Sequence, residues 1–156
     1  MISIKKASID DLEIIQELNN KLSKKESIDF DTTVNPLFAT TEQGTSYFKR
    51  MIEDEDNIVL IAKDEGNPIG YIAAGIEKVG SFRIIPNLCE IDNMWIDEPY
   101  RSQGIGRKLI EEVTTWANSK GIKRMRVIAS YDNIKAINFY KREGFSEYDL
   151  ILEKDI

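Results

Sequence analysis

The sequence contains no histidine and a single cysteine, Cys89. Without histidine the chain lacks the commonest general base and the commonest metal ligand. Ser-His-Asp and Cys-His mechanisms are therefore excluded, and we expect no metal site. One cysteine also excludes an internal disulfide and fits a reducing compartment. Any acid–base chemistry must then use Asp, Glu, Tyr or Lys side chains.

Long apolar runs are missing as well. No stretch approaches the ~20 residues that cross a bilayer, and the first residues, MISIKKASIDD, lack the apolar segment of a secretion signal. We therefore expect a cytoplasmic protein with no membrane partner. The net charge of −6 disfavours a nucleic-acid partner, which normally requires a basic face, and mildly favours cationic partners such as amines.

The length and the apolar periodicity predict one domain over residues 1–156, because no linker or repeat divides the chain. The expected strands are 2–7, 57–64, 68–79, 87–97, 123–130 and one or two more within 145–155. The expected helices are 8–24, opened by a Ser8–Asp11 capping pair, then 41–54, 102–120, and 134–143, capped by Asn133. This order is typical of an α/β (α+β) fold with a mixed sheet covered by helices.

The junction between the strand at 87–97 and the next helix carries the main functional signal. It reads Arg101-x-x-Gly104-x-Gly106, followed by Arg107. A glycine-rich turn at a helix start gathers free main-chain N–H groups and the positive end of the helix dipole, which is suited to a diphosphate. Two arginines add positive charge at its rim. The spacing matches neither a Walker loop nor a dinucleotide-binding fingerprint, since neither motif is completed after Gly106.

A second motif follows in the right order. Its matching residues are Asn133, Ala136, Phe139, Tyr140, Gly144 and Phe145. With Arg101, Gly104 and Gly106, they make residues 87–144 resemble the core of a GNAT-family N-acetyltransferase. The resemblance implies a central, mostly antiparallel, twisted sheet of six to seven strands flanked by about four helices.

The resemblance also implies an activity. Family members move the acetyl group of acetyl-CoA to a primary amine by direct attack through a tetrahedral intermediate. Two alternatives remain open: a non-catalytic module that senses acyl-CoA, and a transferase of a longer acyl group. The joint presence of Glu90 and Tyr140 favours an enzyme, because a sensor needs neither.

The coenzyme contacts implied by the resemblance lie mainly on the turn and on the preceding strand. The expected coenzyme-binding residues are Met94, Trp95, Ile96, Arg101, Ser102, Gln103, Gly104, Ile105, Gly106, Arg107, Asn133, Ala136, Phe139 and Tyr140. Most act through main-chain groups, so side chains such as Trp95 can serve the core instead. Asn133 already has a structural role as a helix cap.

Acetyl transfer needs a base, because an alkyl amine arrives protonated at neutral pH. The resemblance implies Glu90 as this base with Asp92 second, and both can equally be solvated or substrate-orienting groups. It also implies the Met94 N–H as oxyanion donor and Tyr140 as the acid for the leaving thiolate. Cys89 should point to the opposite sheet face from Glu90, as a buried residue rather than a nucleophile.

The acceptor would be set by residues 23–45 and 77–87. We expect Asp29, Phe30 and Phe38 to form an apolar and acidic lip for a cationic amine. The sequence leaves open a polyamine, an aminoglycoside, an amino acid, or a protein N-terminus or lysine. Family members often pair through sheet edges, so the resemblance also allows a homodimer.

Overall fold

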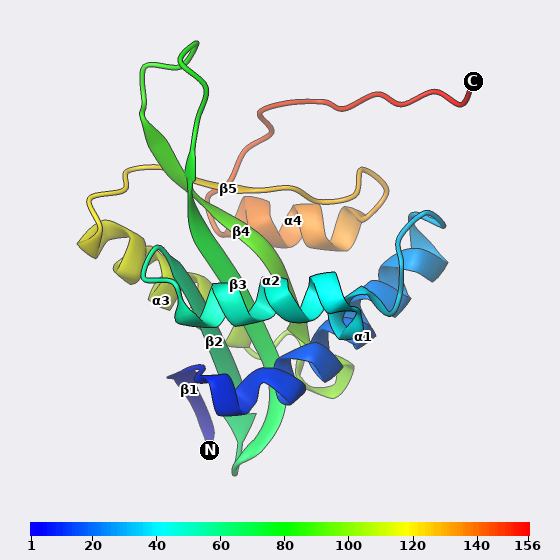
Figure 1. The fold of residues 1–156 in the computed structure, drawn as a ribbon, viewed down its shortest axis with the longest axis vertical. Helices are drawn as coiled ribbons and strands as arrows, with labels where there is room; N and C mark the ends of the chain where they lie inside the picture. Colours follow the sequence, from blue (N-terminus) through cyan, green and yellow to red (C-terminus); the bar gives the residue numbers. More distant parts are fainter.

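The computed structural model describes residues 1–156 and contains one five-stranded sheet with helices on both faces (Figure 1). The strands lie in chain order, and each neighbouring pair is antiparallel except β4 and β5, which are parallel. The strands are β1 (Ile2–Lys6), β2 (Asn57–Asp64), β3 (Asn67–Lys78), β4 (Asn87–Ile96) and β5 (Met125–Val127). The helices are α1 (Leu12–Asp29), α2 (Glu42–Glu53), α3 (Ile105–Ser119) and α4 (Ile134–Arg142), with 3-10 turns η1 (Ile9–Asp11), η2 (Phe38–Thr40) and η3 (Glu98–Tyr100). None of the helices is both long and apolar enough to cross a membrane.

Helices α1 and α2 cover one face of the sheet, and apolar side chains at helical spacing explain why. Phe48, Met51 and Ile52 of α2 are buried together with Ile15 and Leu18 of α1, against inward-facing residues of β2 and β3. Burying such a side chain fully contributes about 1.5–3 kcal/mol. This layer therefore fixes α2 above the strands.

Helix α3 covers the opposite face. Leu109, Val113 and Ala117 form its buried stripe and pack in one cluster with Cys89 and Ile91 of β4. Aromatic side chains of α4 and the following turn pack against the same cluster but stay half-exposed. The functional turn between β4 and α3 is thus anchored on both sides by core residues.

Strands β4 and β5 separate part of the way along. Met125–Val127 pair with Cys89–Ile91, and β4 then continues to Ile96 without a neighbour on that side. Opposite β3, Ala73 aligns with Asn93 and Ala74 with Ile91, so Asp92 is the extra residue of a β-bulge. The bulge and the separation of the strands occur at the same place.

Most expected elements are confirmed. The Ser8–Asp11 capping pair forms, with the Ser8 N–H donating to Asp11 Oδ2 at 3.0 Å. The first helix runs five residues beyond its expected end at 24, to Asp29, although Ser23 is its last buried residue.

Two strand predictions were wrong. The strand expected at 123–130 is only Met125–Val127, because beyond Val127 the chain no longer pairs with β4. No strand forms within 145–155, so the sheet has five strands rather than six to seven. That segment contains the apolar run Leu150–Leu152, but it forms no ladder with the outer edge of β5.

Candidate active site

The turn between β4 and α3 presents a cluster of unpaired main-chain donors. Gly104 adopts the left-handed conformation, with φ of 81°, and no side chain caps the helix. The first intrahelical bond is from Lys108 N to Gly104 O, at 3.1 Å. The N–H groups of the four residues before Lys108 therefore have no protein acceptor.

Two of the other helices, α2 and α4, are capped by a polar side chain, whereas α1 continues from the 3-10 turn η1 and its N-cap residue Asp11 makes no capping bond. Thr41 accepts a hydrogen bond from Gly44 N at 3.0 Å at the start of α2. Asn133 accepts one from Ala136 N at 3.1 Å at the start of α4. The cap expected at Asn133 is thus confirmed, and its side-chain oxygen is engaged there. The uncapped start of α3 fits the diphosphate of a coenzyme, since its free donors and helix dipole both favour an anion.

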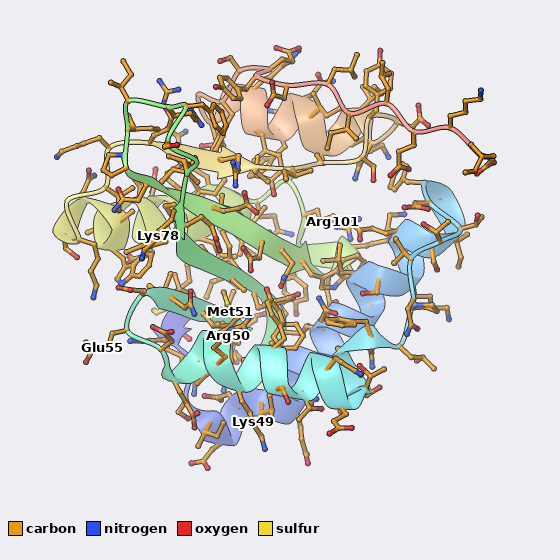
Figure 2. All side chains as sticks on the ribbon, turned by 45° about the horizontal axis from the view of Figure 1, so that its top comes forward. Lys49, Arg50, Met51, Glu55, Lys78 and Arg101 are labelled. Atoms are coloured by element: carbon orange, nitrogen blue, oxygen red, sulfur yellow. The ribbon has the colours of Figure 1, made fainter.

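The two arginines of the motif, Arg101 and Arg107, make different contacts. Arg101, which is labelled in Figure 2, donates from Nε to the carbonyl of Ile96 at 2.8 Å. Its guanidinium lies 4.6 Å from the centre of the Trp95 ring. Its charge therefore holds the turn against the end of β4. Arg107 stays largely exposed at the turn, 3.2 Å from Glu111 and 3.8 Å from Glu143.

The two glycines serve different purposes. A Cβ on Gly104 would meet nothing within 4 Å, so this residue is needed for its positive φ. A Cβ on Gly106 would lie 2.9 Å from Phe139 Cζ and 3.3 Å from Ile96 Cδ1. Gly106 thus allows α3 to approach α4 and β4 closely, which fixes the turn between them.

The edge of β4 beyond the bulge carries unpaired main-chain groups. Asp97 N donates to Ile69 O of the preceding strand at 2.8 Å. Because successive residues of a strand point their N–H groups to alternate sides, those of Met94 and Ile96 point away from β3, where β5 has already diverged. This edge, adjacent to the turn, can bind an extended amide-containing arm.

A hydrogen-bonded network surrounds Asp92. Tyr47 donates from its hydroxyl to Asp92 Oδ2 at 2.6 Å, and Asn93 Nδ2 donates to the Tyr47 hydroxyl at 3.1 Å. Tyr71 in turn donates to Asn93 Oδ1 at 2.6 Å, and Asn19 Nδ2 donates to the Tyr71 hydroxyl at 2.7 Å. We call these five residues the Asp92 network; it joins α1, α2, β3 and β4.

The two carboxylates of β4 have different surroundings. Glu90 forms an ion pair with Arg126, which lies directly opposite on β5. Burial raises the pKa of Asp92, and the nearby charge of Glu90 raises it further, while the Tyr47 hydrogen bond acts in the opposite direction. One side of Asp92 still reaches solvent. Asp92 is therefore the β4 carboxylate without a cationic hydrogen-bond partner.

Tyr140 lies between two other aromatic rings. Its ring centre is 5.2 Å from that of Phe139 and 5.6 Å from that of Phe145, both in edge-to-face contact. Burial raises the pKa of the Tyr140 hydroxyl to about 12, and the charge of Glu26 adds to the effect. The hydroxyl makes no hydrogen bond to protein, so it is protonated and free to donate.

The expected acceptor lip is only partly assembled beside Asp92. Phe38 lies near Tyr47, with ring centres 6.2 Å apart. Asp29 instead pairs with Lys25, at 2.8 Å, on the surface of α1, and Phe30 is half-buried at the end of that helix.

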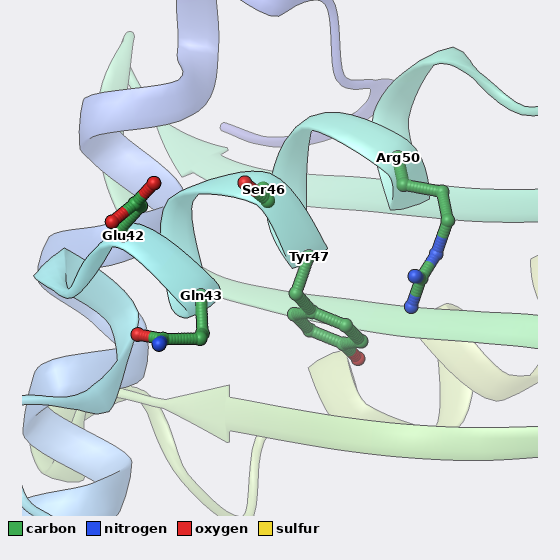
Figure 3. Close-up of a pocket in the computed structure, with 5 residues that line it drawn as sticks. All are labelled: Glu42, Gln43, Ser46, Tyr47 and Arg50. Carbon is green, nitrogen blue, oxygen red and sulfur yellow. The ribbon is translucent and has the colours of Figure 1, made fainter.

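An open pocket of about 490 Å³ lies along α2 and is lined by Glu42, Gln43, Ser46, Tyr47 and Arg50. Figure 3 shows Tyr47 and Arg50 pointing from α2 in the same direction, toward the strands. Because Tyr47 also bonds Asp92, the pocket wall and the carboxylate share one side chain.

Cys89 is fully buried, and burial raises the pKa of its thiol to about 12. This confirms the expectation of an unreactive core cysteine.

Several residues of the site were not anticipated from the sequence. They are Tyr47, Asn93, Tyr71, Asn19 and Arg126, which no motif or spacing in the sequence marks as site residues. For Tyr47 the sequence does offer one indication. A buried tyrosine hydroxyl on a helix usually finds a hydrogen-bond partner, so Tyr47 could have been expected to contact a polar group of the sheet.

The family model described as "Acetyltransferase (GNAT) family" matches residues 22–145, and the chain belongs to this family of acetyltransferases. The N-alpha-acetyltransferase RimI of Mycobacterium tuberculosis is 31% identical over 103 residues, covering 66% of this chain and 61% of that protein. The chain spans only about a third to two thirds of the length of the first curated relatives it matches.

Solved structures share the fold. A mutant of the BH1408 protein from Bacillus halodurans superposes with a TM-score of 0.86 at 18% identity, covering 99% of both chains. AAC(6')-Iy, in complex with the bisubstrate analog CoA-S-monomethyl-acetylneamine, gives a TM-score of 0.75 at 18% identity, covering 100% of this chain and 98% of that one. At this identity the likeness concerns the fold.

Proposed function

We propose that this chain is an N-acetyltransferase that moves the acetyl group of acetyl-CoA to a primary amine on a small molecule or protein. The observation that carries the proposal is the uncapped start of α3 beside the open edge of β4. Family membership and the fold of an enzyme captured with a CoA-linked bisubstrate analog support it.

The turn and the strand edge would hold the coenzyme. The free amides of Gly104, Ile105, Gly106 and Arg107 would bind the diphosphate, as expected for an anion at a helix start. The unpaired groups of β4 would bind the pantetheine arm and bring the thioester to the bulge. There, the Met94 N–H would donate to the oxyanion that forms as the amine attacks.

We assign Asp92 as the base and place Glu90 second, which reverses the order expected from the sequence. Glu90 is engaged by Arg126, whereas every hydrogen bond of the Asp92 network is directed toward the Asp92 carboxylate. Asp92 Oδ1 would remain free to accept the amine proton, directly or through water. Tyr140 would return a proton to the departing thiolate.

The acceptor would arrive as a cation. Glu26 is half-buried on the face of α1 that carries Asn19 and Ser23, and it has no ion-pair partner. Burial and the charge of Asp31 raise its pKa, and its charge also acts on Tyr71 and Tyr140. Together Glu26 and Asp92 would attract an ammonium group and release it as a neutral amine next to the thioester.

Thiol release with acetyl-CoA and a panel of amines tests the proposal. The panel should include a polyamine, an aminoglycoside, free amino acids and peptides with free N-termini. Binding of acetyl-CoA is followed separately by thermal shift, since a ligand of the folded state raises Tm.

The possible results separate the alternatives. Thermal stabilisation together with amine-dependent thiol release is the expected result. Stabilisation without turnover for any amine would favour an acyl-CoA sensor. Faster turnover with propionyl-CoA than with acetyl-CoA would favour a longer acyl group, and no stabilisation by any acyl-CoA would contradict the assignment of the turn.

A further inference from the structure

The Asp92 network begins in the core, under helix α1. Asn19 and Ser23 are the buried polar side chains of this helix, 6% and 8% exposed. The Ser23 hydroxyl donates to Asn19 Oδ1 at 3.2 Å, and Asn19 Nδ2 donates to the Tyr71 hydroxyl at 2.7 Å. Apolar side chains of the same shape would serve the core about equally well, because a buried hydrogen-bonded pair stabilises a protein only modestly. Packing alone therefore does not explain these polar residues.

The charge of Asp92 fixes the direction of every bond in the network. An ionised carboxylate can only accept, so the Tyr47 hydroxyl must direct its proton to Asp92, at 2.6 Å. The Tyr47 oxygen is then the acceptor for Asn93 Nδ2, at 3.1 Å, and the Asn93 amide presents Oδ1 to Tyr71. Tyr71 must donate to that oxygen, and its own oxygen accepts from Asn19. Each group has one allowed role while this order is kept.

Asn93 is the member at which the order can be lost. A half-turn of its amide exchanges the donor Nδ2 and the acceptor Oδ1 with little change in shape. Turned in this way, Oδ1 would face Tyr47 and compete with Asp92 for the hydroxyl proton. The Tyr71 hydroxyl opposes the turn by donating to Oδ1 at 2.6 Å. Asn19 supports Tyr71, because a hydroxyl that accepts a hydrogen bond becomes a stronger donor.

We propose that Asn19 and Tyr71 are positioning residues that hold the Asn93 amide so that Tyr47 donates to Asp92, a role that rests on the proposed function of Asp92 as the base. Neither residue touches the acceptor amine or the coenzyme in this arrangement. They act by stabilising the ionised form of Asp92 through the Tyr47 hydroxyl. Loss of the order should therefore make Asp92 take up a proton at a higher pH.

Charged groups of the neighbouring elements also act on Asp92. They are Glu90 of β4 and Glu77 of β3, which favour the protonated carboxyl, and Arg50 of α2, which favours the ionised one. On β5, Arg126 forms an ion pair with Glu90, and on α1 the charge of Glu26 acts on Tyr71. Burial raises the pKa of the Cys89 thiol and of the Tyr71 hydroxyl, so both stay neutral. Neutral substitutions at positions 19 and 71 remove none of these charges, so they report on the hydrogen bonds.

A double variant separates positioning from packing. Asn19→Leu with Tyr71→Phe removes both partners of one buried hydrogen bond and nearly keeps their shapes, so the cost in stability should be small. The Asn93 amide can then turn, and the acid limb of the kcat/KM–pH profile should move to higher pH. Asn19→Leu alone should give a smaller shift of the same sign, because Tyr71 still donates to Asn93. A purely structural role predicts an unchanged acid limb in both variants.

Two further variants control the route of the effect. Asn20→Leu changes the neighbouring asparagine of α1, whose Oδ1 has no hydrogen-bond partner, and it should leave the acid limb at its wild-type position. Adding Tyr47→Phe to the double variant should give the same acid limb as Tyr47→Phe alone, because the effect passes through that hydroxyl. No shift in the double variant, an equal shift in Asn20→Leu, or a further shift in the absence of the Tyr47 hydroxyl would overturn the proposal.

Carbon-13 NMR of the Asp92 carboxyl in the intact protein gives the same comparison without turnover. The pKa of Asp92 should be higher in the double variant than in the wild type, and equal values would contradict the positioning role. Failure of the wild type to release thiol with any amine of the panel would instead contradict the proposed function. In that case the NMR titration still decides whether Asn19 and Tyr71 act on Asp92.

Discussion

The hydroxyl of Tyr47 donates a 2.6 Å hydrogen bond to Asp92, linking α2 to the bulge of β4 across 45 residues of sequence. The contact places an aromatic wall of the α2 pocket directly on the carboxylate proposed as base. Because Asn93 and Tyr71 extend the same network inward, the orientation of Asp92 is set by three elements at once. The predictions about acid–base chemistry follow from this arrangement.

Replacing Asp92 with Asn should lower kcat/KM by about 10²–10⁴-fold, the usual contribution of a general base. The amide is nearly the same size but cannot take up a proton. Glu90→Gln is the matched variant, and it should have a much smaller effect because Glu90 is engaged by Arg126. Steady-state kinetics with the best amine of the panel makes the comparison; a larger loss for Glu90→Gln would restore the order expected from the sequence.

Replacing Tyr47 with Phe should move the acid limb of the pH–rate profile to higher pH. Burial raises the pKa of Asp92, and the Tyr47 hydrogen bond opposes this by stabilising the charged form. Removing the bond should raise the pKa further, and activity requires the carboxylate, so activity should be lost at a higher pH as the pH falls. Measuring kcat/KM against pH checks the sign. A shift toward lower pH would contradict the role of the network.

Replacing Tyr140 with Phe should lower kcat, by about 10²-fold if proton donation to the thiolate is rate-limiting. Burial raises the pKa of the hydroxyl to about 12, so the wild-type residue holds its proton throughout the neutral range. The edge-to-face contacts with Phe139 and Phe145 need only the ring, so Tm and the affinity for acetyl-CoA should hardly change. Unchanged turnover would remove Tyr140 from the acid role.

Helices α1, α2 and α3 could be predicted from the sequence because each buries one apolar stripe. Leu109, Val113 and Ala117 of α3 recur at helical spacing and all lie in the core. The segment 145–155 shows the limit of such patterns. Its apolar run Leu150–Leu152 favours a strand, but strand formation depends on pairing with a neighbouring edge, which a local pattern does not reveal.

The candidate site likewise has one part that the sequence predicts and one part that it does not. The position of the coenzyme turn could be predicted because Gly104 and Gly106 lie at a local strand-to-helix junction. The choice between Glu90 and Asp92 could not, because it depends on partners distant in sequence. Arg126 lies 36 residues after Glu90 and Tyr47 lies 45 residues before Asp92, and no spacing within β4 encodes either contact.

The two glycines of the turn should respond differently to alanine. Gly106→Ala places a Cβ 2.9 Å from the ring of Phe139, and overpacking of this kind costs about 1–3 kcal/mol. Gly104→Ala meets no neighbour, and its cost of about 1–2 kcal/mol comes from the left-handed backbone alone. Both variants should therefore have a lower Tm, by about 2–4 °C for each kcal/mol, for separate reasons.

A second substitution distinguishes these reasons. Phe139→Leu shortens the side chain that the new methyl group of Gly106→Ala would meet, so the double variant should be more stable than the two single losses predict. The same substitution should leave the cost of Gly104→Ala unchanged, since Phe139 does not approach within 4 Å of that position. Denaturant unfolding of the three single variants, the two double variants and the wild type gives both coupling energies. Equal couplings at the two glycines would mean that the close approach of α3 to α4 does not explain the presence of Gly106 in the turn.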